Sequence, residues 1–291
     1  MIRFLVILLS KLQFILDSIY FHCLEKQHRS QIIHNFITEN EFGNPGGDKQ
    51  LIQKNIDFLK KFKLTNATLV MAGLFNYQEL FNEYLSRMDL RALHKLEPYR
   101  NSGCVVLSYH IGFYSILMLV LMCHGYDVTL LLRTKDTNKG TKLSTEKIKA
   151  GLEALYQKND KLGCLHFVDA FSLTAILQIQ RAIRKGHIIL IYPDTGKDAS
   201  AKSLPIEFFK QKITGHVGLI QIYKILKTSF LPTYLVWEHG KAVLHVHDPL
   251  DINEHTADQE ILNKIYKLFP ELIKQYPEQW IQIISYPFLK Y

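Results

Sequence analysis

The chain has 291 residues, of which 47% are hydrophobic and 21% charged, and it carries a formal net charge of +8. These values allow a sizeable apolar core and exclude both an intrinsically disordered chain and a small disulfide scaffold. The positive charge favours anionic neighbours such as phospholipid headgroups, acyl-carrier proteins, coenzyme A or nucleic acid. Because the lysines are scattered and no nucleic-acid motif occurs, we expect no nucleic-acid partner.

The first 21 residues predict an amphipathic helix. The apolar run from Phe4 to Leu9 is far shorter than the about 20 apolar residues that a membrane-spanning helix needs, and no signal-peptide cleavage site follows it. On a helix, Leu8 and Leu12 share an apolar face opposite Asp17. This helix either packs on the core of the protein or anchors it at a membrane surface.

Helices and turns are expected before the centre of the chain. Residues 24–39 predict a polar helix, and the glycine-rich loop at 43–47 leads to Asp48 as a helix cap. A helix is expected over 48–62, a short strand over 68–72 and another helix over 77–88.

The stretch from Gly103 to Arg133 organises the predicted fold. Two apolar runs, Cys104 to Ser108 and Tyr126 to Leu132, predict buried strands, and an apolar helix is expected between them at 112–124. A strand, a helix and a second strand form a βαβ unit, in which parallel strands place their following loops at one edge of the sheet. His110 lies in such a loop.

The alternation of helices and strands continues to the end of the chain. Further helices are expected at 144–157, 172–185, 215–227 and 257–275, and further strands at 165–168, 187–192, 231–237 and 242–247. No linker-like stretch interrupts them. The sequence therefore predicts one α/β domain over 48–291, with a mixed, mostly parallel sheet flanked by helices, after a helical extension over 1–47.

The cysteines show no metal-binding spacing and read as reduced core residues of a cytoplasmic protein. A catalytic thiol is not expected, because the sequence places no cation beside any of them. The cysteines are Cys23, Cys104, Cys123 and Cys164.

His110 is the first candidate for catalysis, although a histidine after a strand is often structural. The following Ile111-Gly112 begin a predicted helix, whose free N–H groups could bind an oxyanion or a phosphate. There an imidazole could accept a proton from a hydroxyl or an amine, which is the general-base step of acyl transfer. Asp194 follows its own predicted strand in the same way, so the two side chains are expected on one sheet edge. Alternatively, Asp194 only forms a turn with Thr195.

Other polar residues give weaker signals. Arg133 follows a predicted strand and is a candidate clamp for a phosphate or carboxylate, unless it is simply solvated. His245 and His247 share a face of a predicted strand, but a metal site needs more converging ligands, and none is predicted. The Gly-x-Ser-x-Gly pattern of serine hydrolases is absent.

Several segments match, in order, the motifs of one enzyme family. Residues 102–112 are similar to a glycine, an apolar strand and a His-Phe-Gly block, and 128–133 to a strand that ends in arginine. Residues 188–194 are similar to the strand before an Asp-Gln block, 204–210 to a segment with Phe-Phe-Gly, and 275–280 to a Pro-Glu-Gln-Trp ending. Over about residues 50–291 the chain thus resembles the bacterial lipid A late acyltransferases, members of the lysophospholipid acyltransferase-like superfamily.

One departure from that family concerns the acid beside the histidine. The family motif is a histidine, four residues, and then a glutamate or aspartate, whereas the count from His110 ends at Ser115. A serine cannot stabilise an imidazolium by charge, so the base is weaker unless another carboxylate replaces the acid. Asp194 is the first substitute that we expect, and Asp169 the second. Thr195 stands in place of the glutamine of the Asp-Gln block.

The resemblance implies transfer of an acyl group from an acyl-carrier protein or acyl-coenzyme A thioester to a hydroxyl or amine of a lipid or lipid-like acceptor. It places the enzyme at the cytoplasmic face of the inner membrane of a bacterium, peripheral or anchored once by residues 1–21. His110, Ser115 and Asp194 form the expected catalytic group. No metal or other cofactor is implied. The substrate-binding candidates are Gly112, Tyr114 and Arg133.

Two alternatives remain open. Ser115 favours a relative that has lost catalysis and only binds an acyl chain or a carrier protein. The same base chemistry would also serve to acylate a peptide or a polyketide-like metabolite.

Overall fold

The structure is a computed structural model of the chain. The part that it describes comprises residues 7–9, 11–12, 26–40, 48–74, 78–132, 163–170, 172–195 and 202–285. The expected helix at 144–157 and most of the one at 1–21 lie outside these ranges, as do Arg133 and Cys23. Within these ranges, no helix has the length and apolar character that crossing a membrane requires.

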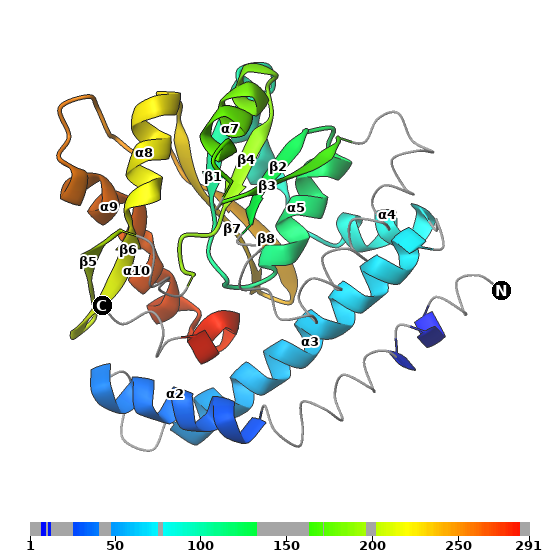
Figure 1. The fold of residues 1–291 in the computed structure, drawn as a ribbon. Helices are drawn as coiled ribbons and strands as arrows, with labels where there is room; N and C mark the ends of the chain where they lie inside the picture. The colour runs from blue at the N-terminus through cyan, green and yellow to red at the C-terminus, as the bar shows by residue number, and fades with distance from the viewer. Residues whose placement is uncertain are drawn as a thin grey trace.

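A six-stranded sheet occupies the middle of the molecule, in the order β3-β2-β4-β1-β7-β8 (Figure 1). All neighbouring pairs from β3 to β7 are parallel, and only β8 pairs antiparallel, with β7. The prediction of a mixed, mostly parallel sheet in an α/β domain is therefore confirmed. The strands are β1 (Cys104–Leu107), β2 (Val128–Leu132), β3 (Leu165–Asp169), β4 (Ile188–Ile191), β7 (Phe230–Glu238) and β8 (Lys241–Val246).

The central strands are buried along their whole length, since every residue of β1 and β4 is buried. This is typical of parallel strands that helices cover on both faces. On one face, Cys104 and Val106 pack with helices α3 (Asp48–Leu74) and α5 (Tyr114–Cys123). On the other face, Val105 and Leu107 pack in a second core with several helices. Those helices are α2 (Lys26–Asn40), α7 (Ala175–Arg184), α8 (Val217–Leu226), α9 (Asp258–Tyr266) and α10 (Leu268–Gln275).

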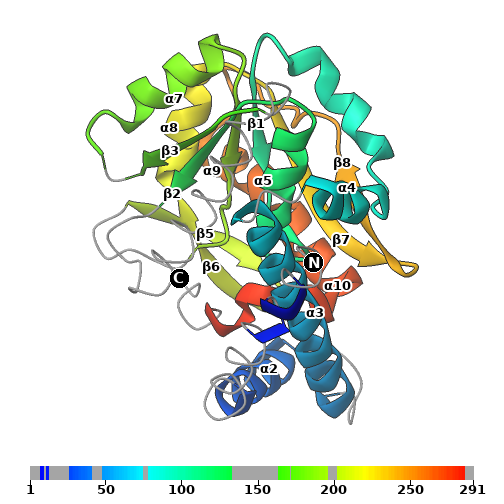
Figure 2. The same cartoon turned by 90° about the vertical axis from the view of Figure 1, so that its right-hand side faces the viewer.

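Helices α2 and α3 lie side by side and extend below the sheet (Figure 2). The strand expected over 68–72 is wrong, because this segment lies inside α3. The Thr68 hydroxyl donates to the Leu64 carbonyl at 2.8 Å, one helical turn back. Leu69 and Ala72 lie three residues apart and are both buried, which is a helical period. A short apolar run with a threonine and a valine does not by itself distinguish a buried helix from a strand.

An antiparallel hairpin, β5 (Ser203–Phe208) and β6 (Gln211–His216), lies between β4 and α8 and was not expected. Its turn consists of Phe209 and Lys210 rather than the Asn-Gly or Asp-Gly pair that announces a hairpin in a sequence. Phe209 adopts a φ of 53°, which is uncommon for a bulky side chain. The helix expected from residue 215 therefore begins only at Val217.

The long helix expected over 257–275 is two helices, α9 and α10, which meet at Lys267. Pro270 lies in the first turn of α10. It has no N–H to donate to Tyr266, and its ring disfavours a continuous helix there. The other described elements are α4 (Gln78–Ser86) and three 3₁₀ segments: η2 (Arg91–Tyr99), η3 (Pro277–Gln279) and η4 (Ile281–Ser285).

Trp280 joins distant parts of the second core. Its side chain is fully buried, and its ring centroid lies 5.2 Å from that of Phe36 in α2. The rings of Phe208 in β5 and Phe269 in α10 lie 6.1 and 5.7 Å away. Helix α2 thus packs on the same core as the domain, while the expected domain boundary at residue 48 stays a prediction.

Replacing Trp280 with alanine should lower the free energy of unfolding by about 3–5 kcal/mol, because a large side chain is removed from a closely packed aromatic cluster. Urea unfolding followed by circular dichroism measures this. The control is Leu177→Ala in α7, whose side chain is 53% exposed and whose loss should cost no more than about 0.5 kcal/mol. Equal stabilities of the two variants would contradict the described packing.

Candidate active site

Two loops leave the same edge of the sheet, after β1 and after β4. These strands are parallel neighbours, and Leu107 pairs with Ile191 at their carboxyl ends. His110 and Asp194 each lie three residues beyond that pair. The register of the sheet therefore brings the two side chains together, as polar residues at the carboxyl ends of parallel strands are expected to be.

Asp194 contacts His110 twice. Its Oδ1 lies 2.9 Å from Nδ1 of the imidazole, and its Oδ2 accepts the backbone N–H of His110, also at 2.9 Å. The aspartate side chain is fully buried and that of the histidine is 11% exposed. A carboxylate can only accept, so Nδ1 carries the proton, and the lone pair of a neutral imidazole is on Nε2. The predicted juxtaposition of the two residues is confirmed.

Two tyrosines pack against the imidazole. The ring centroid of Tyr114 lies 4.6 Å from that of His110, and the ring of Tyr192 lies 4.9 Å away. The Tyr192 hydroxyl donates to the Tyr114 carbonyl at 2.8 Å. Burial, with a smaller effect of the Asp194 charge, raises the pKa of Tyr114 to about 12, and burial also raises the pKa of Tyr192. Both phenols therefore stay protonated near neutral pH, and among these three side chains the imidazole of His110 is the candidate base.

The loop that carries Asp194 is held on both sides of that residue. The Tyr266 hydroxyl, from α9, donates to the Pro193 carbonyl at 2.7 Å. Nε2 of His216, at the end of β6, lies 3.0 Å from the Thr195 carbonyl. These contacts fix the backbone around the aspartate and limit the directions in which its carboxylate can point.

Gly112 forms the turn between His110 and α5. Its φ is 63°, and a Cβ atom there would lie 2.1 Å from the Leu235 carbonyl oxygen of β7. Its N–H donates to the Gln279 carbonyl at 2.9 Å, and the Phe113 N–H donates to the Leu235 carbonyl at 2.6 Å. The expectation that the Gly112 N–H is free to bind an oxyanion is wrong, because this donor is already bonded to the C-terminal segment, residues 276–281. Helix α5 begins two residues later, at Tyr114.

Ser115, at the position where the resemblance leads us to expect an acid, has a partner on another helix. Its hydroxyl donates to Oδ1 of Asn66 in α3 at 3.0 Å. Asp169, the second expected substitute, ends β3, and β2 and β4 separate that strand from β1. Of the three residues considered for this role, Asp194 is the one that the structure places against His110.

Three contributors to the site were missed from the sequence. Tyr192 directly follows the last residue of β4, a position that could have been noted beside that of Asp194. Asn66 lies in a part of α3 for which the sequence predicts no element, and no local pattern indicates its contact with Ser115. Gln279 belongs to the Pro-Glu-Gln-Trp ending, whose resemblance to the family indicates no structural role by itself.

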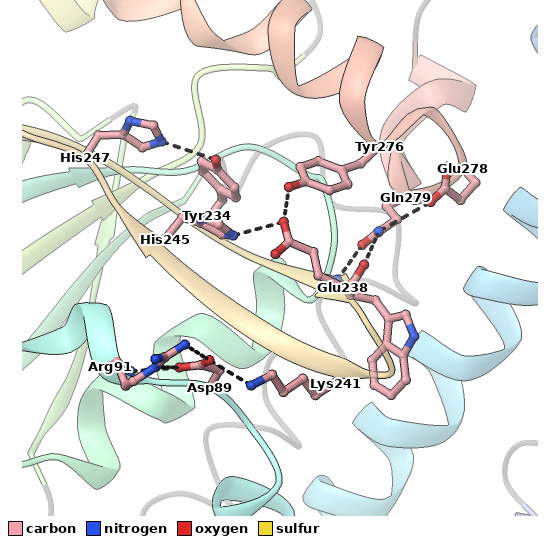
Figure 3. A network of polar contacts seen from close by, with 11 residues as sticks. Asp89, Arg91, Tyr234, Glu238, Lys241, His245, His247, Tyr276, Glu278 and Gln279 are labelled. Atoms are coloured by element: carbon pink, nitrogen blue, oxygen red, sulfur yellow. Dashed lines mark hydrogen bonds and ion pairs between the residues drawn. The ribbon is translucent and has the colours of Figure 1, made fainter.

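Two of the described cysteines are poor nucleophiles because of burial. Burial raises the pKa of Cys104 and of Cys123 to about 12, so both thiols stay protonated. His245 and His247 contact Glu238 and Tyr234, at 3.1 and 3.2 Å (Figure 3). Across the described ranges, no group of three or more histidine, cysteine, aspartate or glutamate side chains is arranged to hold a metal ion.

Comparisons with known proteins found the following similarities. The family model described as bacterial lipid A biosynthesis acyltransferase matches residues 48–285. Among solved structures, the 1-acyl-sn-glycerophosphate acyltransferase PlsC from Thermotoga maritima is similar, at 12% identity and a TM-score of 0.40, over 88% of this chain and 98% of that chain. The search of curated proteins returned no match.

Replacing Gly112 with alanine should destabilise the protein more than replacing Gly240 does. Both glycines have a positive φ, but a Cβ at Gly240 would meet open space. Gly240→Ala therefore costs only the left-handed conformation, about 1–2 kcal/mol. Gly112→Ala adds a clash with the Leu235 carbonyl, which should cost about 1–3 kcal/mol more. Urea unfolding measures the free energy of unfolding of both variants. If the two variants lose the same stability, the close approach of Gly112 to β7 is not real.

Proposed function

Because the chain belongs to the bacterial lipid A biosynthesis acyltransferase family, and is thus an acyltransferase, we propose that His110 is its general base. The donor is a fatty acyl thioester of an acyl-carrier protein or of coenzyme A. The acceptor is a hydroxyl or amine of a lipid or lipid-like molecule. The observation that carries the proposal is the 2.9 Å contact between Nδ1 of His110 and Oδ1 of the buried Asp194.

Asp194 supplies what Ser115 lacks. When the imidazole accepts a proton it becomes a cation, and an adjacent buried carboxylate stabilises that cation by charge. The same carboxylate holds the ring in the tautomer whose Nε2 can accept a proton. This supports an active enzyme in spite of the serine at the usual position of the acid.

The proposed reaction needs no covalent enzyme intermediate. Nε2 of His110 accepts the proton of the acceptor hydroxyl or amine while the acceptor atom attacks the thioester carbonyl carbon. The tetrahedral intermediate collapses, the carbon–sulfur bond breaks, and the leaving sulfur takes the proton from Nε2. The products are an ester or amide of the acceptor and the free thiol of the carrier. His110 returns to its neutral state.

The surroundings of His110 suit this chemistry. Tyr114 and Tyr192 cover the imidazole and reduce the access of water, which would otherwise hydrolyse the thioester. Helix α5 begins at Tyr114, so the positive end of its dipole favours negative charge that develops beside the base. Arg133, outside the described residues, stays a proposed clamp for a phosphate or carboxylate.

A second candidate function is binding without turnover, which the loss of the family acid at Ser115 favours. Such a protein would bind acyl thioesters but neither transfer nor hydrolyse the acyl chain. Acylation of a peptide or polyketide-like metabolite would use the same base with another acceptor. A panel of lipid, peptide and polyketide-type acceptors separates these possibilities from the proposed function.

Substitutions at the three candidate catalytic positions should give unequal effects. His110→Ala should abolish acyl transfer, and Asp194→Asn should lower kcat by about 10³–10⁴-fold, because the amide no longer stabilises the imidazolium. Ser115→Ala should keep most of the activity, since the Ser115 hydroxyl contacts Asn66. The release of free thiol from an acyl thioester, with a lipid acceptor present, measures all three. A Ser115→Ala variant as impaired as Asp194→Asn would contradict the assignment.

We further propose that the enzyme is peripheral at the cytoplasmic face of the inner membrane and contacts it through residues 1–21. The net charge of +8 favours an anionic lipid surface. Leu8 and Leu12, in the short helical pieces described there, are 49% and 51% exposed. Exposed leucines four positions apart in the sequence are suited to insertion into the headgroup region.

Deleting residues 1–21 should move the protein from the membrane fraction to the soluble fraction. The finer variant Leu8→Glu/Leu12→Glu should reduce cosedimentation with vesicles that contain anionic phospholipid, because it places charges on the apolar face. Leu173→Glu, at an equally apolar but distant exposed position, is the control and should sediment like the wild type. Undiminished membrane binding of the deletion variant would contradict the anchor.

A further inference from the structure

The edge of β7 that faces β1 extends beyond the last residue of β1. The two strands pair only over residues 230–232 of β7, opposite Val105 to Leu107. Farther along, backbone groups of the alternate residues Leu235 and Trp237 face the same side, as in any strand. On this edge, the Leu235 carbonyl accepts the Phe113 N–H. The backbone N–H and carbonyl of Trp237 form hydrogen bonds with a side chain from the C-terminal segment.

That side chain is the carboxamide of Gln279, which is 2% exposed. Its Oε1 accepts the Trp237 N–H at 2.8 Å, and its Nε2 donates to the Trp237 carbonyl, also at 2.8 Å. The amide thus satisfies both backbone groups of one residue, as a neighbouring strand would. Figure 3 shows Gln279 beside Glu238, at the end of β7, with dashed lines to the strand.

The main chain at Gln279 holds the His110 turn. The Gln279 carbonyl accepts the Gly112 N–H at 2.9 Å, and the Ile281 N–H donates to the His110 carbonyl at 2.9 Å. Ile111 and Trp280 form an antiparallel bridge between these two hydrogen bonds. Both backbone groups of His110 are therefore fixed, the N–H by Asp194 and the carbonyl by the C-terminal segment.

We propose that Gln279 is a positioning residue for the general base. Its carboxamide fixes residues 279–281 on the edge of β7, and this segment holds the turn at the place where the imidazole meets Asp194. Gln279 touches no reacting atom and acts only through His110. The inference rests on the role of His110 proposed above.

The chemistry of the amide is specific to this position. Leucine has a similar size but offers neither donor nor acceptor, so Gln279→Leu leaves the Trp237 N–H and carbonyl without these partners. Gln279→Asn keeps both functions on a side chain that is one methylene shorter. We therefore expect kcat to be lower in Gln279→Asn than in the wild type, and lowest in Gln279→Leu. If the leucine variant does not fold, the asparagine variant provides the test.

A neighbouring tyrosine supplies a matched control. The Tyr276 hydroxyl donates to Glu238, so it also attaches the C-terminal segment to β7 (Figure 3). The hydrogen bond and ring contact described for this side chain go to Glu238 and Tyr234, both in β7, and not to the His110 turn. Tyr276→Phe removes an attachment between the same two elements and should leave kcat within about twofold of the wild type.

The experiment is steady-state kinetics of the full-length variants with an acyl thioester and a lipid acceptor, below their unfolding temperatures. Gln279→Leu should lower kcat about 100-fold, with the KM of both substrates little changed, because the base is displaced while substrate contacts remain. The Asp194→Asn/Gln279→Leu double variant should be hardly slower than Asp194→Asn alone, because both changes disrupt one unit. If Gln279 only supported folding, the losses of kcat in the two single variants would instead multiply in the double variant.

The outcomes separate the two proposals. If His110→Ala and Asp194→Asn remain active, the proposed base is wrong whatever Gln279 does. If those variants lose activity while Gln279→Leu and Gln279→Asn match Tyr276→Phe, or if the losses multiply in the double variant, only the positioning role is overturned.

Discussion

The hydrogen bond between His110 and Asp194 is the interaction on which the site depends. It requires two parallel strands to be neighbours in one register, so that residues three positions past the Leu107 and Ile191 pair meet. It also requires burial, because an exposed aspartate would be screened by water and would orient the imidazole poorly. The sheet meets both conditions, since β1 and β4 are its most deeply covered strands and helices close both faces.

The position of the histidine is set by contacts that come from far along the chain. A positive φ at Gly112 brings the turn against β7, and the C-terminal segment also pairs with the turn. Tyr266 and His216 hold the opposite loop around Asp194. The imidazole is therefore held in one orientation, which is the preorganisation that the proposed general base requires.

The sequence predicted the parts of this arrangement that depend on local pattern. The apolar runs of β1 and β4, each followed by a polar residue, were sufficient to predict that His110 and Asp194 share an edge. The strand expected over 68–72 was wrong because a short apolar run fits a buried helix equally well. The β5–β6 hairpin has no glycine in its turn, so it gave no signal. The use of the Gly112 N–H and the contact of Gln279 with Trp237, 42 residues away, depend on tertiary structure that no local pattern encodes.

The most direct test of the central claim compares the lipids and small metabolites of cells that produce either the wild-type protein or His110→Ala at equal levels, by mass spectrometry. The account predicts a lipid species, heavier than its precursor by one fatty acyl chain, that is present with the wild-type protein and absent with the variant. The same acylated lipid in both samples would contradict a catalytic role of His110. A difference confined to peptide or polyketide-like metabolites would contradict a lipid acceptor.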